Sequence, residues 1–194
     1  TLCEVRHIRR FDNFLRVKFR GIKRVKLNNW INGSLSDLAE VEILESEYPF
    51  FEVRNAKINK LKMKGKYSFQ YDDNIEISNS EFDTKDAFWH SKNMIIRDSV
   101  IKGEYLAWYS ENLTFINCKI IGTQPFCYCK NLVLENCTME QCDLSFERSE
   151  VQATIKGKID SVKNPLKGQI KADEIGEIIL DKTFNFKTDC KIIC

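Results

Sequence analysis

The sequence has no long apolar run, no signal-peptide pattern and none of the common nucleotide-binding motifs. Its longest apolar stretches are too short to cross a bilayer, so we expect no membrane span. No charged start leads into an apolar segment, so no signal peptide is expected. P-loop, dinucleotide-binding, nucleophile-elbow and basic–aromatic RNA motifs are also missing. We therefore expect no cofactor and no nucleic-acid partner.

The composition is that of an ordinary globular chain. Of 194 residues, 43% are hydrophobic and 30% are charged, which fits a single domain with a sizeable core. The net charge of +2 hides a basic segment. Residues 1–27 hold nine lysines or arginines against Glu4 and Asp12. Because these charges alternate with apolar residues, they indicate the solvated face of strands.

A repeat of nineteen residues dominates the middle of the chain. It is marked by asparagines at constant spacing: Asn55, Asn74, Asn93, Asn112 and Asn131. Apolar residues lie one and three positions after each asparagine, which is the spacing of one strand face. Such a unit cannot bury its apolar face alone, so successive units must stack. The repeat predicts an all-β fold, a single-stranded right-handed parallel β-helix.

The asparagines are expected to form a structural ladder at a corner of each coil. Asparagine tolerates the left-handed backbone conformation that a sharp turn requires. In a vertical column its amide can also hydrogen-bond the amides of the neighbouring coils. We expect one domain in three parts: an irregular basic start or cap (1–54), regular coils (55–149), and irregular final coils with a cap (150–194).

The segment that leads back to each asparagine carries two interleaved sets of side chains. One set contains Ala87, Trp89, Leu106, Trp108, Pro125, Cys127, Leu144 and Phe146. The other contains Phe69, Tyr71, Phe88, His90, Ala107, Tyr109, Phe126 and Tyr128. In an extended strand the two sets point to opposite sides. Leu144 and Phe146, flanked by acidic residues, favour burial of the first set; in the opposite register Trp89 and Trp108 are exposed instead.

With the first set inside, the second set predicts an exposed row of aromatic rings. The candidate binding residues are Tyr71, His90, Tyr109, Tyr128, Phe88 and Phe126. An exposed apolar stripe of this length indicates contact with another molecule or cover by a terminal segment of the same chain. Flat rings about 4.8 Å apart can stack sugar rings, a peptide or a neighbouring subunit. His90 is interpreted as one more flat ring rather than as a base.

The eight cysteines do not predict a metal site. Cys118 and Cys137 share one column of the repeat, whereas Cys127 and Cys129 lie on a different wall, so four thiolates cannot converge on zinc. Small buried thiols that fill a narrow column are the simpler interpretation. Free thiols also favour a cytoplasmic location.

A carbohydrate-active enzyme is the alternative function. Lyases and hydrolases on this fold need clustered acids, and the candidates are Asp72, Asp73, Asp83, Asp86 and Asp98. Asp72 and Asp73 are adjacent and point different ways in a strand, and Asp86 lies four residues before His90. The paired aspartates, Gly-His-Gly and Arg-Ile-Lys of polygalacturonases are missing. A non-catalytic binding or assembly module is therefore the leading hypothesis, with a polysaccharide, a protein or a second copy as its partner.

Several motifs resemble a bacterial family that is known only as a domain of unknown function. They are Asn112-Leu-Thr-Phe-Ile-Asn-Cys, Asn131-Leu-Val-Leu-Glu-Asn-Cys, Asp86-Ala-Phe-Trp-His-Ser, Glu104-Tyr-Leu-Ala-Trp-Tyr-Ser and Gly157-Lys-Ile-Asp-Ser-Val-Lys-Asn-Pro. The resemblance covers roughly residues 46–182, and residues 1–40 match poorly. The family is similar to the pectin-lyase-like right-handed β-helices. The resemblance thus implies a fold, with no established activity and no catalytic residue.

Overall fold

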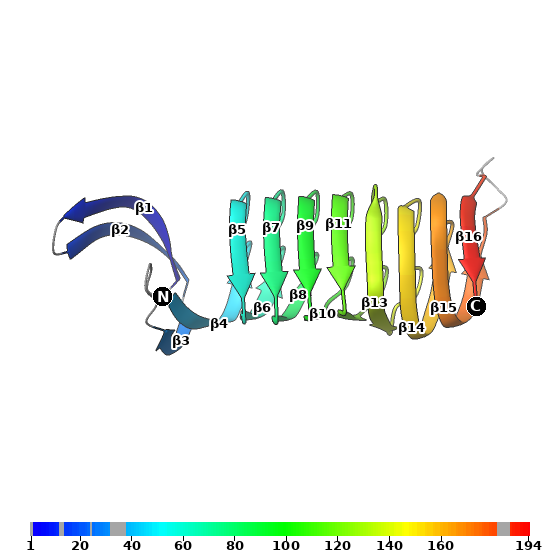
Figure 1. Ribbon diagram of the computed structural model, residues 1–194, viewed down its shortest axis with the longest axis horizontal. Helices are drawn as coiled ribbons and strands as arrows, with labels where there is room; N and C mark the ends of the chain where they lie inside the picture. Colours follow the sequence, from blue (N-terminus) through cyan, green and yellow to red (C-terminus); the bar gives the residue numbers. More distant parts are fainter. Residues whose placement is uncertain (1, 12–13, 24, 32–37, 182–186) are drawn as a thin grey trace.

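The structure, a computed structural model, describes residues 2–11, 14–23, 25–31, 38–181 and 187–194. Side chains are described for residues 46–181 and 187–194. Within these ranges every regular element is a β-strand, as the sequence predicts. From residue 54 onward the strands lie side by side in a row along the long axis of the molecule (Figure 1).

The row is a parallel solenoid in which the chain visits the same walls once in every coil. The first wall contains β5 (Arg54–Asn59), β7 (Asp73–Ser78), β9 (Lys92–Arg97), β11 (Glu111–Ile116), the beginnings of β13 (Leu132–Glu140), β14 (Glu150–Lys163) and β15 (Lys167–Ile179), and β16 (Asp189–Ile193). The second wall contains β4 (Leu38–Glu47), β6 (Lys62–Lys66), β8 (Glu81–Lys85), β10 (Val100–Lys102), β12 (Lys119–Ile121) and the ends of β13, β14 and β15. Return segments close each coil on the third side.

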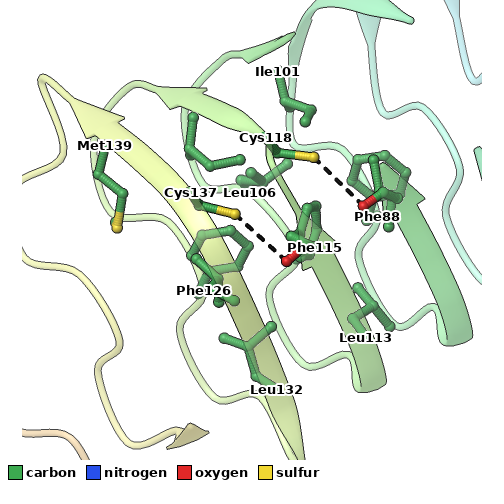
Figure 2. Packing of buried hydrophobic residues seen from close by; sticks show 14 of the residues in the cluster. Phe88, Ile101, Leu106, Leu113, Phe115, Cys118, Phe126, Leu132, Cys137 and Met139 are labelled. Atoms are coloured by element: carbon green, nitrogen blue, oxygen red, sulfur yellow. Dashed lines mark hydrogen bonds between the residues drawn. The ribbon is translucent and has the colours of Figure 1, made fainter. Parts of the chain in front are cut away.

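The register confirms the nineteen-residue coil. Ile75 pairs with Met94, and Met94 pairs with Leu113, so each partner lies nineteen residues further along the chain. Both walls alternate buried and exposed residues, and the buried ones face a core that runs along the inside. Figure 2 shows part of this core, where the aromatic rings of Phe115 and Phe126 lie among aliphatic side chains and cysteines.

The spacing changes at both ends of the regular coils. Beyond residue 149 Val151 pairs with Gly168, so this coil is shorter than nineteen residues. Before residue 54, β1 (Leu2–Phe11) and β2 (Phe14–Lys23) pair antiparallel with each other, and β3 (Val25–Ile31) pairs antiparallel with β4. The strands of residues 2–31 are therefore not solenoid coils. The interpretation of the basic segment as a solvated face lies outside the residues whose side chains are described.

The asparagines form a ladder that is visible in both backbone and side chain, with one break in the column of amides. All five residues have a positive φ between 48° and 57°: Asn55, Asn74, Asn93, Asn112 and Asn131. The side chain of Asn112 donates to Asn93 and accepts from Asn131, each at 2.9 Å. Asn93 departs from the column because its amide donates to Asp73, at 2.8 Å, rather than to Asn74. Each coil therefore turns at a residue suited to the left-handed conformation and is tied to the coil before it.

Glycine is required where the second wall turns into the return segment. At Gly122 an added Cβ would lie 2.2 Å from the carbonyl oxygen of Gly103 in the preceding coil, and φ is +128°. A Cβ added at Gly103 would lie 2.0 Å from the carbonyl oxygen of Thr84. The backbones of successive coils thus approach too closely here for any side chain.

Replacing Gly122 with alanine should destabilise the fold by roughly 2–4 kcal/mol, because the new Cβ overlaps a backbone carbonyl and φ is unfavourable. The matched control is Gly157→Ala, where φ is +81° but no heavy atom lies within 4 Å of the added Cβ. The control should lose only about 1–2 kcal/mol. Urea denaturation of both variants measures the difference, and equal losses would show that the coils tolerate a side chain at this corner.

Candidate binding surface on the return wall

The return segments 67–71, 86–90, 105–109 and 124–128 are not extended strands. Every second residue has a positive φ, as in Asp86 (55°), Phe88 (61°) and His90 (56°). The backbone N–H of Phe88 donates to Ser68 of the preceding coil, whereas that of His90 donates to Trp108 of the following coil. The segment therefore bonds alternately in both directions along the solenoid axis.

This backbone overturns the predicted alternation of buried and exposed side chains. Ala87 and Phe88 are both fully buried, whereas Trp89 is partly exposed and His90 is exposed. A left-handed residue in every second position breaks the rule that neighbours on a strand point to opposite faces. Side chains consequently point inward in adjacent pairs and outward in adjacent pairs.

Neither predicted set therefore lies on one side of the wall. Phe88 and Phe126 are 0% exposed, so their assignment to the exposed row was wrong. They belong to an internal column in which Phe69 and Phe88 stack at 5.0 Å. Ala107 interrupts this column, and Phe115 from the first wall contacts both Phe88 and Phe126 edge-on. Burial of the first set was also wrong at Trp89, Trp108 and Leu144, which are partly exposed.

The outward rings form what we call the aromatic ladder: Tyr71, His90, Tyr109 and Tyr128. Consecutive ring centroids are 5.0, 5.2 and 4.8 Å apart, and each pair of ring planes is inclined by 9°. Tyr71 and Tyr109 are 49% and 47% exposed. Tyr128 is half-buried, and this burial raises its pKa. The predicted row of rings is therefore present for these four residues.

Two tryptophans flank the aromatic ladder. The rings of Trp89 and Trp108 stack at 5.5 Å with planes inclined by 3°. The indole N–H of Trp89 donates to the carbonyl of Tyr105 at 2.6 Å, and that of Trp108 donates to Gln124 at 2.7 Å. Because each indole is bonded to the next coil, its orientation is fixed by the stacking of the solenoid.

The stacking also decides which part of each ring can be reached from outside. A ring between two others, such as His90 or Tyr109, has both faces covered by its neighbours. The exposed parts are the ring edges, the phenolic hydroxyls and the imidazole nitrogens. Ring edges carry partial positive charge and act as weak hydrogen-bond donors. The wall therefore presents these edges together with stronger donors, the phenolic hydroxyls.

Three of the five candidate acids are held by structural contacts. Asp73 accepts from Asn93, Asp98 accepts from Asn117 at 3.0 Å, and Asp83 pairs with Lys102 at 3.6 Å. Acid–base hydrolysis needs two carboxyl groups that face one site. None of these contacts brings two carboxyl groups together.

A groove of about 640 Å³ follows the glycine corners. Its lining includes Asp83 and Glu104, and each of these carboxylates is ion-paired with a lysine of an adjacent coil. Both acids of the groove are therefore compensated by a lysine.

The described cysteines are free thiols. Cys118 and Cys137 point into the core, where their sulfurs lie 3.5 Å from the carbonyls of Ile96 and Phe115 (Figure 2). Burial raises the pKa of Cys127 and Cys142 to about 12, which keeps these thiols protonated. Among the described residues no group of three or more His, Cys, Asp and Glu side chains is arranged to hold a metal ion.

Comparison with known proteins identifies the family. A family model described as "Protein of unknown function (DUF3737)" matches residues 3–193. The chain belongs to this family. The match includes most of residues 1–40, for which the sequence predicted a poor match. No curated protein and no solved structure matches the chain. Within the described residues, no helix is long and apolar enough to span a membrane.

Another candidate acid, Asp72, directly follows Tyr71 of the aromatic ladder and is buried. Its side chain is 1% exposed, and one oxygen accepts from the backbone N–H of Val53 at 2.8 Å. The other oxygen has no hydrogen-bond partner. In later coils Ser91 and Ser110 occupy the same place and donate to backbone carbonyls. Burial raises the pKa of Asp72 to about 8, although the bond from Val53 opposes the shift.

Asp72 should therefore make stability fall as the pH rises. Below its unfolded pKa of 3.8, both states carry the proton. Between that value and about 8, only the unfolded state releases it, so the free energy of unfolding falls by up to about 1.4 kcal/mol per pH unit. Asp72→Asn, which keeps the acceptor for Val53, and Asp72→Ser, which copies the later coils, should remove this contribution.

Urea titrations at several pH values test the expectation. The advantage of either variant over the wild-type chain should grow between pH 4 and 8 and then remain constant. A difference that does not change with pH would contradict the burial of an unpaired carboxyl at this position.

Proposed function

We propose that the chain is a non-catalytic binding or assembly module whose contact surface is the aromatic ladder with the flanking Trp89 and Trp108. The observation that carries the proposal is a set of exposed aromatic side chains held in one rigid array on a single wall. Monomeric proteins rarely expose aligned apolar groups without a use for them. Aromatic side chains are also the residues that most often dominate binding energy.

Rigidity supports this role because it lowers the entropic cost of binding. The tyrosines are held by their stacked neighbours, and each indole is held by a hydrogen bond to a backbone carbonyl. Side chains that are ordered before contact lose little freedom on contact. The wall thus resembles a preorganised hot spot more than a loose hydrophobic patch.

The orientation of the rings favours a protein partner. Sugar rings bind aromatic side chains through the ring faces, but these faces are occupied within the aromatic ladder. Ring edges and hydroxyls suit the carbonyl oxygens and aromatic faces of another protein. Lys85 extends the surface, since it lies 5.0 Å from the ring centre of Tyr105, whose ring lies 5.3 Å from that of Trp108.

We further propose that the solenoid is right-handed and related to the pectin-lyase-like β-helices. Connections between parallel strands are right-handed in almost all known cases. The inward aliphatic columns and the asparagine ladder support the same relation. Buried thiols that remain free support an intracellular location.

Photo-crosslinking tests the contact surface directly. Tyr109→p-benzoylphenylalanine keeps an aromatic ring at an exposed rung, and irradiation of host cells should link it to a defined protein. The matched control places the same group at Val100, which is exposed on the second wall. Mass spectrometry identifies the linked partner in each case.

The partner found in this way is then titrated against purified variants. The double variant Tyr71→Ala/Tyr109→Ala should weaken binding about 100-fold, because two ring contacts of roughly 1.4 kcal/mol each are lost. Circular dichroism confirms that the variant is folded. Equal crosslinking from positions 100 and 109, or unchanged affinity, would contradict the proposal. Binding of oligosaccharides that depends on the same tyrosines would identify a polysaccharide partner instead.

A further inference from the structure

A column of charges that alternate in sign runs beside the aromatic ladder, at the start of the first wall. Its members pair from coil to coil at a spacing of nineteen residues up to Lys130. Glu150 continues the column, because its backbone N–H donates to Cys129 in the same pattern as in the earlier coils. One buried residue per coil, such as Ser91, separates this column from the aromatic ladder. We call it the charge column: Arg54, Asp73, Lys92, Glu111, Lys130 and Glu150.

The charge column changes sign about the midpoint of the aromatic ladder. This midpoint lies between His90 and Tyr109, since two rungs lie on either side of it. Members of the charge column at equal distances from the midpoint carry opposite charges: Lys92 and Glu111, Asp73 and Lys130, Arg54 and Glu150. Read in either direction from one end to the other, each base thus stands where the reversed column has an acid.

The opposite flank of the aromatic ladder repeats this order. Beyond the two tryptophans, Lys85 and Glu104 lie in adjacent coils with their charged groups 3.1 Å apart. Lys92 and Glu111 of the charge column form the matching pair, at 3.6 Å. Each flank therefore has a lysine in the coil of His90 and an acid in the following coil.

This charge pattern distinguishes two ways of placing a second return wall against the first. A two-fold rotation that reverses the solenoid axis sets each flank against the same flank of the second copy, so every member of the charge column faces an opposite charge. A two-fold rotation that keeps the solenoids parallel sets opposite flanks together. It places Lys92 against Lys85 of the second copy, and Glu111 against Glu104, which is unfavourable. The antiparallel arrangement is therefore the self-complementary one.

The rings fit the same antiparallel arrangement. Their centroids are 4.8 to 5.2 Å apart, so a rigid partner stays in contact with every rung only if it has the same period. A second copy has this period. The rotation places His90 opposite Tyr109 of the second copy, where the phenolic hydroxyl can donate to an imidazole nitrogen. It places Tyr71 opposite Tyr128, where the two hydroxyls can hydrogen-bond each other. Each of these contacts occurs twice, as a two-fold interface requires.

We propose that the partner of the aromatic ladder is a second copy of the chain, bound face to face and antiparallel about a two-fold axis between the coils of His90 and Tyr109. The inference rests on the proposed function, because it uses the same contact surface. At the centre of each flank two ion pairs of opposite direction meet, so each charge gains a second neighbour of opposite sign. The exposed parts of Trp89 face Trp108 of the second copy.

Charge reversal tests the register. The wild-type chain should sediment as a dimer. Lys92→Glu and Glu111→Lys should each weaken dimerisation about 100-fold, roughly tenfold at each of two equivalent contacts. An equimolar mixture of the two variants should restore the dimer, because positions 92 and 111 of different chains then carry opposite charges. Both positions carry the same sign within each variant chain, so this recovery reports a contact between chains alone.

The matched control is Lys62→Glu, which reverses a lysine of the second wall that is paired with Glu81 of the next coil at 3.5 Å. This variant also loses an ion pair between coils, but it should dimerise like the wild-type chain. Tyr71→Ala/Tyr109→Ala should be monomeric. Circular dichroism confirms that each variant is folded.

Photo-crosslinking of the purified chain locates the facing residues. p-Benzoylphenylalanine in place of Tyr109 should give a crosslinked dimer, and mass spectrometry of that dimer should find the attachment in the segment around His90. Attachment around position 109 itself would indicate a parallel dimer and contradict the proposal.

Three other results would overturn the proposal. The first is a wild-type chain that remains monomeric at about 100 μM. The second is a dimer that the tyrosine substitutions dissociate but neither charge reversal weakens, which would show a different register. The third is a dimer that the tyrosine substitutions leave intact, which would place its interface elsewhere. The proposed contact surface would survive the first and third results if position 109 is crosslinked to a different protein in cells, since that capture needs no second copy.

Discussion

The whole structure depends on one constraint: each coil must return to the same place one strand spacing further along the axis. Left-handed residues at the corners make this possible, and the ladder from Asn93 through Asn112 to Asn131 fixes their register. At another corner the constraint requires glycine: at Gly103 and Gly122 the backbones of successive coils lie too close together for any side chain. Core packing, ion pairs and ring stacking all follow from this repetition.

Repetition converts a single side chain into a continuous surface feature. One tyrosine in a loop is flexible, but a tyrosine stacked between rings of adjacent coils is fixed, as Tyr109 is. The same logic explains the buried carboxyl, since Asp72 occupies a place that later coils give to serine. The register also places Ile178 in the column of the buried Val162, although Ile178 itself is exposed.

Much of this could be predicted from the sequence because a constant period determines register directly. The coil length, the inward aliphatic columns and the asparagine corners all followed from spacing. The return wall did not, because alternation assumes an extended backbone and this segment has a left-handed residue in every second position. A chemical signal was nevertheless present: the buried column carries phenylalanine, as in Phe88, whereas the exposed rungs His90 and Tyr109 carry polar atoms that need water or a partner. The unpaired oxygen of Asp72 depends on its immediate neighbours and could not be predicted from spacing.

Distances between spin labels test the repeat most directly. Lys57, Glu76 and Gln152 belong to one outward column, with Glu76 one coil and Gln152 five coils from Lys57. In a Cys3→Ser/Cys190→Ser/Cys194→Ser background, labels on cysteines introduced at 57 and 152 should lie about 24 Å apart, and labels at 76 and 152 about 19 Å apart, at about 4.8 Å per coil. The stacked register would be contradicted if the distance from 76 to 152 were not shorter than the distance from 57 to 152 by one strand spacing.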